Sequence, residues 1–408
     1  MITLTSLCCN GSEILRKRNN YMNLDDIRKN IDGIDEKILK LFSERMELCI
    51  QVAEYKAKNG MEVFQGGREK QVIAGIEAKS APHLKAASKL LFSQIMEISK
   101  CLQTERLTEF EPPETEQLKQ NPRIACPGIK GSYTEEACFK VFGKKARIEY
   151  FDTFDQVFEA VKNNKADYGI VPIENSTAGG VDGTYDLLSR YDMYICKRLS
   201  IPVNHVLAAL SPDCGVKKII SHEQALHQCQ SFIKSLNCKT SAAPNTSIAA
   251  RSVAEAGAEE KDTACICSEH CADLYGLTVL KKGIADNSEN FTRFIVISKE
   301  LQIEENADII GLCLSLPHVT GSLFKLLTRF NYCGLNLTKI ESRPMPPHIR
   351  KIASEKAEDK ENFEVIFYLD FEGSLQNPSV VKLLKSLEKE CLYYRFLGNY
   401  RDMDKGVK

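Results

Sequence analysis

A long helical pattern with one charge inside its apolar stripe constrains this 408-residue chain most. Apolar residues recur at alternating intervals of four and three, which is the spacing of a helix with a single apolar seam. A seam position between Leu41 and Leu48 is occupied by Arg45. A guanidinium in an apolar stripe is costly unless an anion meets it, so either a glutamate of a facing helix or an anionic ligand is expected there. The seam consists of Leu24, Ile27, Ile31, Ile34, Ile38, Leu41, Leu48, Val52 and Tyr55.

Helix geometry places two further cations relative to Arg45. Lys56 lies eleven residues later, on nearly the same face and about 16 Å along the axis. Arg28 lies seventeen residues earlier, about 25 Å away, so it could reach the same ligand only from a second copy of the chain. An exposed apolar seam also favours a homodimer or a higher homo-oligomer.

Two more helical patterns follow. One begins near Arg68-Glu69, after Gly66-Gly67, and the other carries an apolar stripe from Leu84 to Leu102. Ser99 and Gln103 are four residues apart, so they share one face of that last helix.

These residues, from Leu24 to about Leu107, resemble the all-helical chorismate mutase family. The resemblance implies an intertwined dimer in which Arg45 and Arg28 of the partner subunit hold the two substrate carboxylates. Lys56 and Gln103 would donate to the ether oxygen of the breaking bond. The reaction is a unimolecular rearrangement, so pinning a reactive conformer and stabilising the developing charge suffice, and no cofactor or metal is expected.

The resemblance extends to the polar wall of that site. Glu69 would take the ring hydroxyl, and Arg68 and Ser99 would complete the wall. The family usually has an acidic residue three positions before the arginine of Arg-Glu, where this chain has Gln65. The amide oxygen of Gln65 can still accept a hydrogen bond, so altered affinity is expected rather than lost activity.

After an acidic, proline-rich linker at 109–122, short apolar runs alternate with helical patterns, which predicts a parallel α/β architecture of two lobes with a cleft between them. The loop with Gly128 and Gly131 after the first strand fits neither the dinucleotide nor the Walker pattern. A small carboxylate held at the N-terminus of the helix from about Thr134 fits better.

Four motifs of this part carry a second resemblance. Glu174-Asn175 stands at a strand end, and Thr292-Arg293 stands at the start of the strand that continues to Ile297. The four motifs are Gly128 to Ala137, Val171 to Gly179, Ser221-His222 with Gln224 and Gln228-Cys229, and Asn290 to Phe294. A Thr-Arg pair at a strand entrance is by itself compatible with an ordinary polar edge. Together, the order and spacing of the motifs resemble the prephenate dehydratases.

That resemblance implies a role for several of these residues. Thr292 is tied to catalysis, and Glu174, Asn175, Gln228 and Arg293 belong to the cleft. Prephenate loses carbon dioxide and a ring hydroxide, so the enzyme must assist departure of the hydroxyl. We expect Thr292 to act as a positioned hydrogen-bond donor, with a proton from Glu174 or water.

Histidines offer an alternative proton source for this reaction. His222 and His227 are the two candidates near the helix that carries Gln228.

The last part, 307–400, has the order βαββαβ, which predicts a ferredoxin-like sandwich. His318 to Phe324 and Glu341 to Pro344 resemble the ACT domain that senses phenylalanine. The resemblance implies an effector site formed by Gly321, Ser322, Leu323, Glu341, Ser342, Arg343 and Pro344. A sandwich used only for dimerisation is the alternative, and 348–362 is expected to be a charged loop.

Composition excludes several classes of protein. A net charge of -1 gives no field for nucleic acid or an anionic membrane, and no apolar run approaches the ~18 residues of a membrane span. The sixteen scattered cysteines fit reduced core thiols better than a zinc site or a disulfide framework, which favours a cytoplasmic protein.

The predicted organisation is multidomain: an all-α domain at 22–108 after a disordered extension at 1–21, a two-lobed α/β domain at 123–298, and an α+β domain at 307–400. The predicted function is conversion of chorismate through prephenate to phenylpyruvate, with phenylalanine as inhibitor. A dehydratase with an inactive helical dimerisation domain and a non-catalytic amino-acid sensor are the alternatives.

Overall fold

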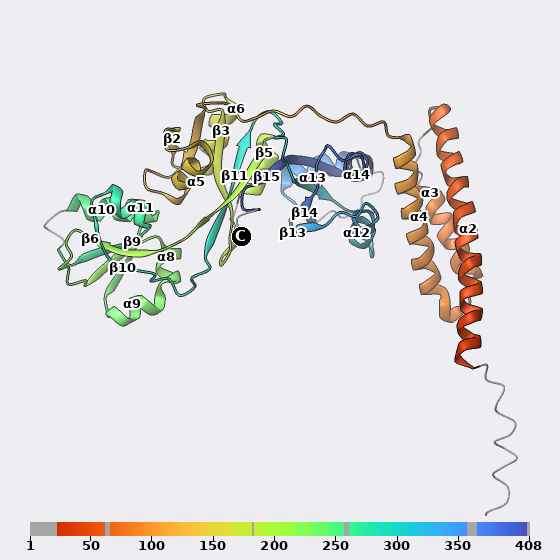
Figure 1. Cartoon of the computed structure of the whole chain (residues 1–408), viewed down its shortest axis with the longest axis horizontal. Coiled ribbons are helices and arrows are strands. Elements are labelled where there is room, and N and C mark those ends of the chain that lie inside the picture. The colour runs from red at the N-terminus through yellow and green to blue at the C-terminus, as the bar shows by residue number, and fades with distance from the viewer. Residues whose placement is uncertain (1–22, 62–65, 182, 257–260, 357–364, 406–408) are drawn as a thin grey trace, which may run out of the picture. The chain divides into compact units, whose positions relative to one another are not determined.

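The computed structural model describes residues 23–61, 66–181, 183–256, 261–356 and 365–405 (Figure 1). The chain forms two compact units, Met1–Glu109 and Phe110–Lys408, hereafter the helical unit and the α/β unit. The predictions for residues 1–21 and for Gln65 lie outside the described residues. Within the described ranges, no helix has both the length and the apolar content needed to cross a membrane.

The helical unit consists of α2 (Leu24–Lys58), α3 (Gly66–Lys79), a short 3-10 turn (Pro82–Leu84) and α4 (Lys85–Leu107). These are the three predicted helices. Asn23 caps the N-terminus of α2, because its side chain accepts a hydrogen bond from the Asp26 amide at 2.8 Å.

The apolar seam of α2 is exposed in this unit. Its buried apolar side chains, among the described residues, are Met46 and Ala53 on α2 and Met96 on α4. All nine seam residues are exposed to solvent, eight of them by half or more. The seam is therefore a large apolar surface that the described residues of the helical unit do not cover.

The first lobe of the α/β unit is one sheet with three helices. In sheet order its strands are β5 (Tyr194–Pro202), β11 (Phe291–Ser298), β3 (Tyr168–Asn175), β1 (Arg123–Pro127) and β2 (Arg147–Phe151), and the two-residue β4 (Gly179–Gly180) pairs with β3. Its helices are α5 (Tyr133–Phe142), α6 (Phe154–Lys162) and α7 (Thr184–Tyr191).

The predicted parallel α/β architecture is confirmed for β1, β2 and β3. It is wrong at β11, which runs antiparallel to both β3 and β5, and at β6 (Val206–Ala209) of the second lobe, which is antiparallel to both of its neighbours. The direction of β11 has a consequence for the cleft. It pairs Thr292, at the start of β11, with Asn175, at the end of β3. In a parallel pair these two residues would lie at opposite edges of the sheet.

The second lobe has its own five-stranded sheet, in the order β10 (Thr278–Lys282), β6 (Val206–Ala209), β9 (Thr263–Cys267), β7 (Lys218–Ser221) and β8 (Lys239–Ala242). Its helices are α8 (Glu223–Gln228), α9 (Gln230–Leu236), α10 (Thr246–Ala256) and α11 (Glu269–Leu274). The single helix expected through Phe232 is divided at Cys229 into α8 and α9. The chain enters this lobe after β5 and leaves it before β11 (Figure 1).

The C-terminal part contains the six predicted elements of the order βαββαβ and one further helix between the second and third strands. Its elements are β12 (Ile309–Ser315), α12 (Ser322–Tyr332), β13 (Leu337–Pro344), α13 (Pro347–Lys356), β14 (Val365–Glu372), α14 (Pro378–Glu390) and β15 (Tyr393–Asp402). The antiparallel sheet order is β13-β14-β12-β15, as in a ferredoxin-like sandwich. The charged loop expected from residue 348 is wrong up to residue 356, because α13 forms there and buries Ile349 and Ala353, four residues apart on one face. Residues 357–362 lie outside the described part.

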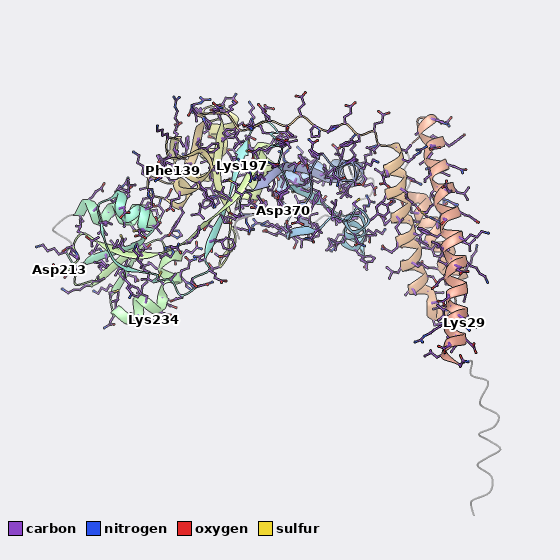
Figure 2. All side chains as sticks on the ribbon, viewed as in Figure 1. Lys29, Phe139, Lys197, Asp213, Lys234 and Asp370 are labelled. Atoms are coloured by element: carbon purple, nitrogen blue, oxygen red, sulfur yellow. The ribbon has the colours of Figure 1, made fainter. Side chains whose placement is uncertain are left out.

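The C-terminal sheet and the first lobe form one continuous sheet, which the sequence patterns did not predict. β15 pairs in parallel with β5, so that Asp402 lies opposite Arg198. The guanidinium of Arg198 is 6% exposed and binds Asp370 at 2.8 Å and Asp402 at 2.7 Å. Asp370 comes from β14, so this buried cluster joins three strands of the two sheets (Figure 2 labels Asp370 and Lys197).

Candidate active site

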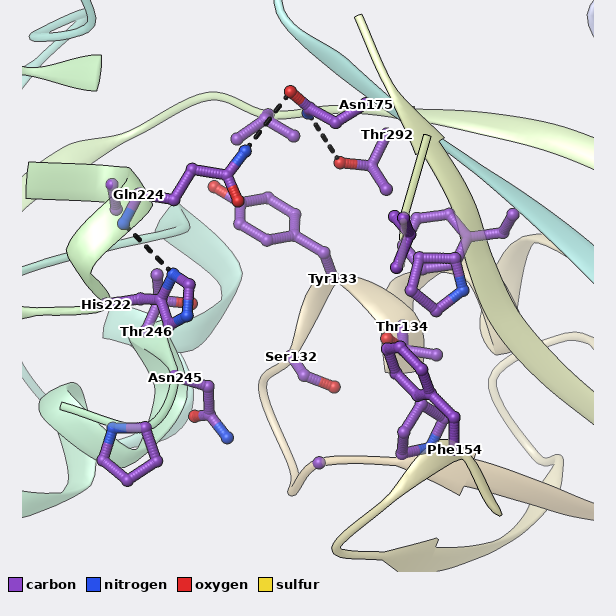
Figure 3. A pocket seen from close by; sticks show the side chains of 18 of the residues that line it. Ser132, Tyr133, Thr134, Phe154, Asn175, His222, Gln224, Asn245, Thr246 and Thr292 are labelled. Carbon is purple, nitrogen blue, oxygen red and sulfur yellow. Dashed lines mark hydrogen bonds between the residues drawn. The ribbon is translucent and has the colours of Figure 1, made fainter. Parts of the chain in front are cut away.

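A cleft of ≈ 430 Å³ lies in the α/β unit and takes its lining from both lobes. Figure 3 shows polar side chains converging on it from several elements. The first lobe contributes Ser132, Tyr133, Thr134, Asn175 and Thr292, and the second contributes His205, His222, Gln224, Gln228, Asn245 and Thr246.

The side-chain amide of Asn175 is held in one orientation by backbone groups on both sides. Its Oδ1 accepts from the Thr177 and Ala178 amides, each at 3.1 Å. Its Nδ2 donates to the carbonyl of Phe291 at 3.1 Å and to Asn290 Oδ1 at 2.9 Å. Because a backbone N–H only donates and a carbonyl only accepts, the oxygen and the nitrogen of Asn175 cannot be exchanged.

This fixed amide determines what the hydroxyl of Thr292 can do. Asn175 Nδ2 also donates to Thr292 Oγ1 at 3.0 Å (Figure 3), so its two N–H groups are shared among three acceptors. Thr292 therefore accepts at its oxygen and keeps its own O–H for an acceptor in the cleft. The arrangement provides a hydrogen-bond donor whose oxygen is held in place before a ligand arrives.

The cleft can attract an anion through its helix termini. Among its described lining residues there is no lysine or arginine, and Asp152 is the one acidic residue. Ser132 caps α5 by accepting from the Glu135 amide at 3.2 Å, and Asn245 caps the start of α10 by accepting from the Ile248 amide at 2.7 Å. The first-turn N–H groups of a helix carry a partial positive charge, so two separate termini face this cavity with charge suited to carboxylates. This geometry fits the carboxylate expected at the helix near Thr134.

Glu174 and Arg293 do not line the cleft, which corrects their expected place. They lie opposite one another across β3 and β11, one position from Asn175 and Thr292, and neighbouring residues of a strand point to opposite faces. The Glu174 carboxylate pairs with Arg293 and with Lys339 of β13, the latter at 2.7 Å. Glu174 thus connects the strand pair behind the cleft to the C-terminal part.

The three histidines near the cleft differ in environment. His222 lines the cavity and caps α8, where its Nδ1 accepts from the Gln224 amide at 3.3 Å (Figure 3). His227 is exposed and is not one of the lining residues. His205, which the motifs did not indicate, lines the cavity and is 2% exposed. Burial lowers the pKa of His205, although a hydrogen bond with Gln228 acts in the opposite direction.

In the helical unit, Arg45 and Ser99 are brought together. Arg45 donates to Ser99 Oγ at 2.8 Å and faces Cys49 Sγ at 3.8 Å. Gln103 Nε2 donates to the Cys49 carbonyl at 3.0 Å. No carboxylate among the described residues forms an ion pair with Arg45, so the alternative of a facing glutamate is not realised there, and the guanidinium can still meet an anionic ligand.

The remaining expected residues of this unit are less closely associated. Glu69 forms an ion pair at 2.7 Å with Lys100, a cation that the sequence patterns did not single out. Lys56 is half-buried, whereas Arg68 is exposed. Arg28 is 65% exposed, and its ion pair is with Asp25 at 3.7 Å on its own helix.

The expected effector residues form two separate groups in one copy of the chain. Gly321 begins α12 with a φ of 89°, a left-handed conformation that glycine adopts readily. Glu341 binds Arg343 at 2.6 Å and Lys339 at 3.1 Å. Burial raises the pKa of Glu341, but these two cations outweigh it and lower the pKa overall. Among the described contacts, no hydrogen bond joins the first group (Gly321, Ser322, Leu323) to the second (Glu341, Ser342, Arg343, Pro344).

Comparisons with known proteins identify both units. The family model described as prephenate dehydratase matches residues 124–302, and the model described as chorismate mutase type II matches residues 27–104. The bifunctional chorismate mutase/prephenate dehydratase of Aquifex aeolicus is 30% identical over 383 residues, which cover 92% of this chain and 97% of that protein. Arogenate dehydratase 1 of Petunia hybrida is 36% identical over 68% of this chain and 66% of its own length.

A solved structure supports the same assignment. The prephenate dehydratase of Arthrobacter aurescens in complex with L-Phe matches with a TM-score of 0.60 at 29% identity, over 69% of this chain and 91% of that one. With both family models matched in order, and with similarity to a bifunctional relative along nearly its whole length, the chain belongs to the family of bifunctional chorismate mutase/prephenate dehydratases.

Proposed function

We propose that the helical unit rearranges chorismate to prephenate and that the cleft of the α/β unit converts prephenate to phenylpyruvate, with Thr292 as the donor to the departing hydroxyl. One observation carries the role of Thr292. Asn175, fixed by backbone groups on both sides, donates to Thr292 Oγ1 and so leaves the Thr292 O–H for the cleft.

The cleft suits the two bond cleavages of this reaction. As the bond to the ring carboxylate breaks, its electrons enter the ring and the ring hydroxyl leaves, forming water with a proton. A hydrogen bond from Thr292 stabilises the charge on the leaving oxygen. The carboxylate that is retained can be bound at a helix terminus, whereas the one that leaves as carbon dioxide needs a weakly interacting wall, which Phe154, Pro172 and Phe294 supply.

Substitution of Thr292 tests this role. Thr292→Ala should lower kcat for prephenate by about a hundred- to a thousandfold, the usual effect of removing one such donor. Thr292→Ser keeps the hydroxyl and is the matched control, expected to retain most of the activity. Chorismate consumption should be unchanged in both variants. Prephenate turnover within twofold of wild type in Thr292→Ala would refute the assignment.

For the mutase we propose a site shared by two copies of the chain. Arg45 and Arg28 of the partner subunit hold the two carboxylates of chorismate, Lys56 and Gln103 donate to the ether oxygen, and the remaining polar wall is formed by Arg68, Glu69, Ser99 and Gln65. The exposed seam of α2 supports a homodimer, and the exposure of Arg28 leaves it available to a neighbouring copy.

We further propose that phenylalanine inhibits the dehydratase through the C-terminal part, as an ACT domain does. Support comes from the ferredoxin-like strand order and from the complex with L-Phe of the similar Arthrobacter enzyme. Gly321→Asn tests the site, because asparagine tolerates the left-handed backbone but adds a side chain where the ligand would approach. Gly334→Asn, at another left-handed glycine with open space around its Cα, is the control. Equal inhibition of the two variants would contradict the proposed site.

Arogenate is a second candidate substrate of the same cleft. Relatives named arogenate dehydratase are 33–36% identical to this chain, and arogenate has an ammonium group where prephenate has a ketone. The carboxylate of Asp152 at the cleft could accept that ammonium. Comparing kcat/KM for both substrates in wild type and Asp152→Asn tests this: a selective loss with arogenate supports it, and equal values in the two proteins refute it.

A further inference from the structure

We propose that His205 is a positioning residue of the dehydratase, holding the far end of a hydrogen-bond chain that crosses the cleft and orients Thr292. The inference rests on the proposed role of Thr292. The chain runs through the side chains of Thr292, Asn175, Thr177, Gln228, His205 and Tyr133.

The directions of the hydrogen bonds between Asn175 and His205 follow from the fixed amide of Asn175. Asn175 Oδ1 can only accept, so the Thr177 hydroxyl, at 2.7 Å, must donate to it. Thr177 Oγ1 therefore accepts, and the group of Gln228 that faces it at 2.9 Å is the donor Nε2. The other end of the Gln228 amide, Oε1, is then turned toward His205.

The tautomer of His205 follows from the orientation of Gln228. Its Nε2 lies 3.0 Å from Gln228 Oε1, which only accepts, so Nε2 carries the proton. In the neutral ring Nδ1 is then an acceptor, and the Tyr133 hydroxyl lies 3.3 Å from it. The same hydroxyl lies 3.3 Å from the Asn204 carbonyl, so its one O–H is shared between these two acceptors. Burial, which lowers the pKa of His205, favours this neutral form near pH 7.

The hydrogen-bond chain connects side chains of the two lobes at the cleft. Thr292, Asn175 and Thr177 belong to the first lobe, whereas Gln228 ends α8 in the second. His205 lies on the segment of polypeptide that connects the two lobes, directly before β6. A donor at His205 Nε2 holds Gln228 so that it can reach Thr177. This contact couples the approach of the lobes to the position of the Thr177 hydroxyl, which binds Asn175, and through Asn175 to the position of Thr292. Amides in the chain make it a positioning device rather than a route for protons.

Two substitutions of His205 separate hydrogen bonding from packing. His205→Leu fills the space but removes the donor, and we expect kcat for prephenate to fall by about ten- to a hundredfold, because small errors in position are costly to turnover. His205→Gln places an amide nitrogen near the original Nε2 and should restore kcat to within about threefold of wild type. His227→Leu, at the exposed histidine of α8, is the matched control and should have no effect. Thermal unfolding verifies that each variant is folded.

Combined variants test whether His205 acts through the chain. Thr177→Val together with His205→Leu should cost no more in kcat than the worse of the two single changes, since both break the same chain. Multiplied effects, equal losses in His205→Leu and His205→Gln, or full activity in His205→Leu would overturn the proposal. If Thr292→Ala is also fully active, the proposed function of the cleft fails; if only Thr292→Ala is impaired, the failure is confined to His205.

Discussion

The helical unit and the α/β unit differ in how much of their apolar surface is buried within one copy of the chain. The α/β unit encloses several clusters of fully buried side chains, and its cleft is bounded by hydrogen bonds within one copy of the chain. The helical unit leaves the whole seam of α2 exposed, and its described residues bury only three apolar side chains. The α/β unit therefore has a buried core within one copy of the chain, whereas the described part of the helical unit has an apolar face that a second chain could cover.

The two candidate sites differ in the same way. In the cleft, backbone groups fix Asn175, and Asn175 fixes Thr292. In the helical unit Arg45 binds Ser99, but Arg28 is exposed and pairs with a residue of its own helix. Dehydratase chemistry should therefore depend on one copy of the α/β unit and mutase chemistry on two copies of the helical unit.

The largest expected effect comes from placing charge in the seam. Ile34→Glu with Ile38→Glu should reduce chorismate turnover by more than about a hundredfold, because two carboxylates would be buried between helices of a dimer. Prephenate turnover should stay within about twofold of wild type. Leu39→Glu is the control, since Leu39 is 66% exposed on the same helix but outside the seam. Sedimentation of the three proteins shows whether loss of activity accompanies loss of the dimer. If the double variant remained a dimer with normal mutase activity, the seam would not be the dimer interface that the mutase needs.

A substitution inside the α/β unit should have the reverse selectivity. Arg198→Ala removes the cation shared by Asp370 and Asp402 and leaves two buried carboxylates unpaired. The free energy of unfolding of this unit should fall by about 3–5 kcal/mol. Urea unfolding monitored by prephenate turnover measures the loss. Arg251→Ala, which removes an exposed ion pair with Glu255, should change the free energy of unfolding by less than about 0.5 kcal/mol. Similar losses in the two variants would show that the joined sheet does not depend on the cluster of Arg198, Asp370 and Asp402.

Dilution of the wild-type protein should lower the mutase activity but not the dehydratase activity, by a smaller factor than the substitutions. An activity that needs two copies is lost as the protein dissociates, whereas one that needs a single copy is not. The specific activity with chorismate should decrease several-fold when the protein is diluted below its dimer dissociation constant, and that with prephenate should remain constant. If both specific activities decreased together, both sites would require the dimer.

The smallest expected effect is a pH-dependent contribution within the α/β unit. Burial raises the pKa of Asp167, but hydrogen bonds from Arg123 and Lys119 outweigh it and lower the pKa to about 2. A lowered folded-state pKa stabilises the fold above the unfolded value of 3.8, and this contribution is lost as the pH falls toward 2. Wild type should resist urea more than Asp167→Asn at pH 7, and the difference should shrink between pH 4 and pH 2. A difference independent of pH would exclude the ionised pair as its cause.

The sequence predicted most elements, because apolar periodicity is a local property. Only the resemblance to the prephenate dehydratases predicted that Thr292 and Asn175 belong to one cleft. The sequence did not predict which way β11 runs, and that direction is what puts the two residues at one edge. Glu174 was misplaced because its partner Lys339 is far along the chain and its strand face depends on pairing. Ser132 and Asn245 could have been noticed as helix caps from their local sequence, whereas nothing local marks His205 as part of a chain that spans both lobes.

Complementation between two inactive mutases tests the shared site most directly. Arg28→Ala and Arg45→Ala chains are each expected to lack mutase activity while keeping wild-type prephenate turnover. After subunit exchange at equal amounts, half of the dimers contain one chain of each kind, and each of these dimers has one site with both arginines. Activity with chorismate should recover to about a quarter of the wild-type value. No recovery after verified exchange would contradict the account, because it would mean that Arg28 and Arg45 of one copy serve the same site.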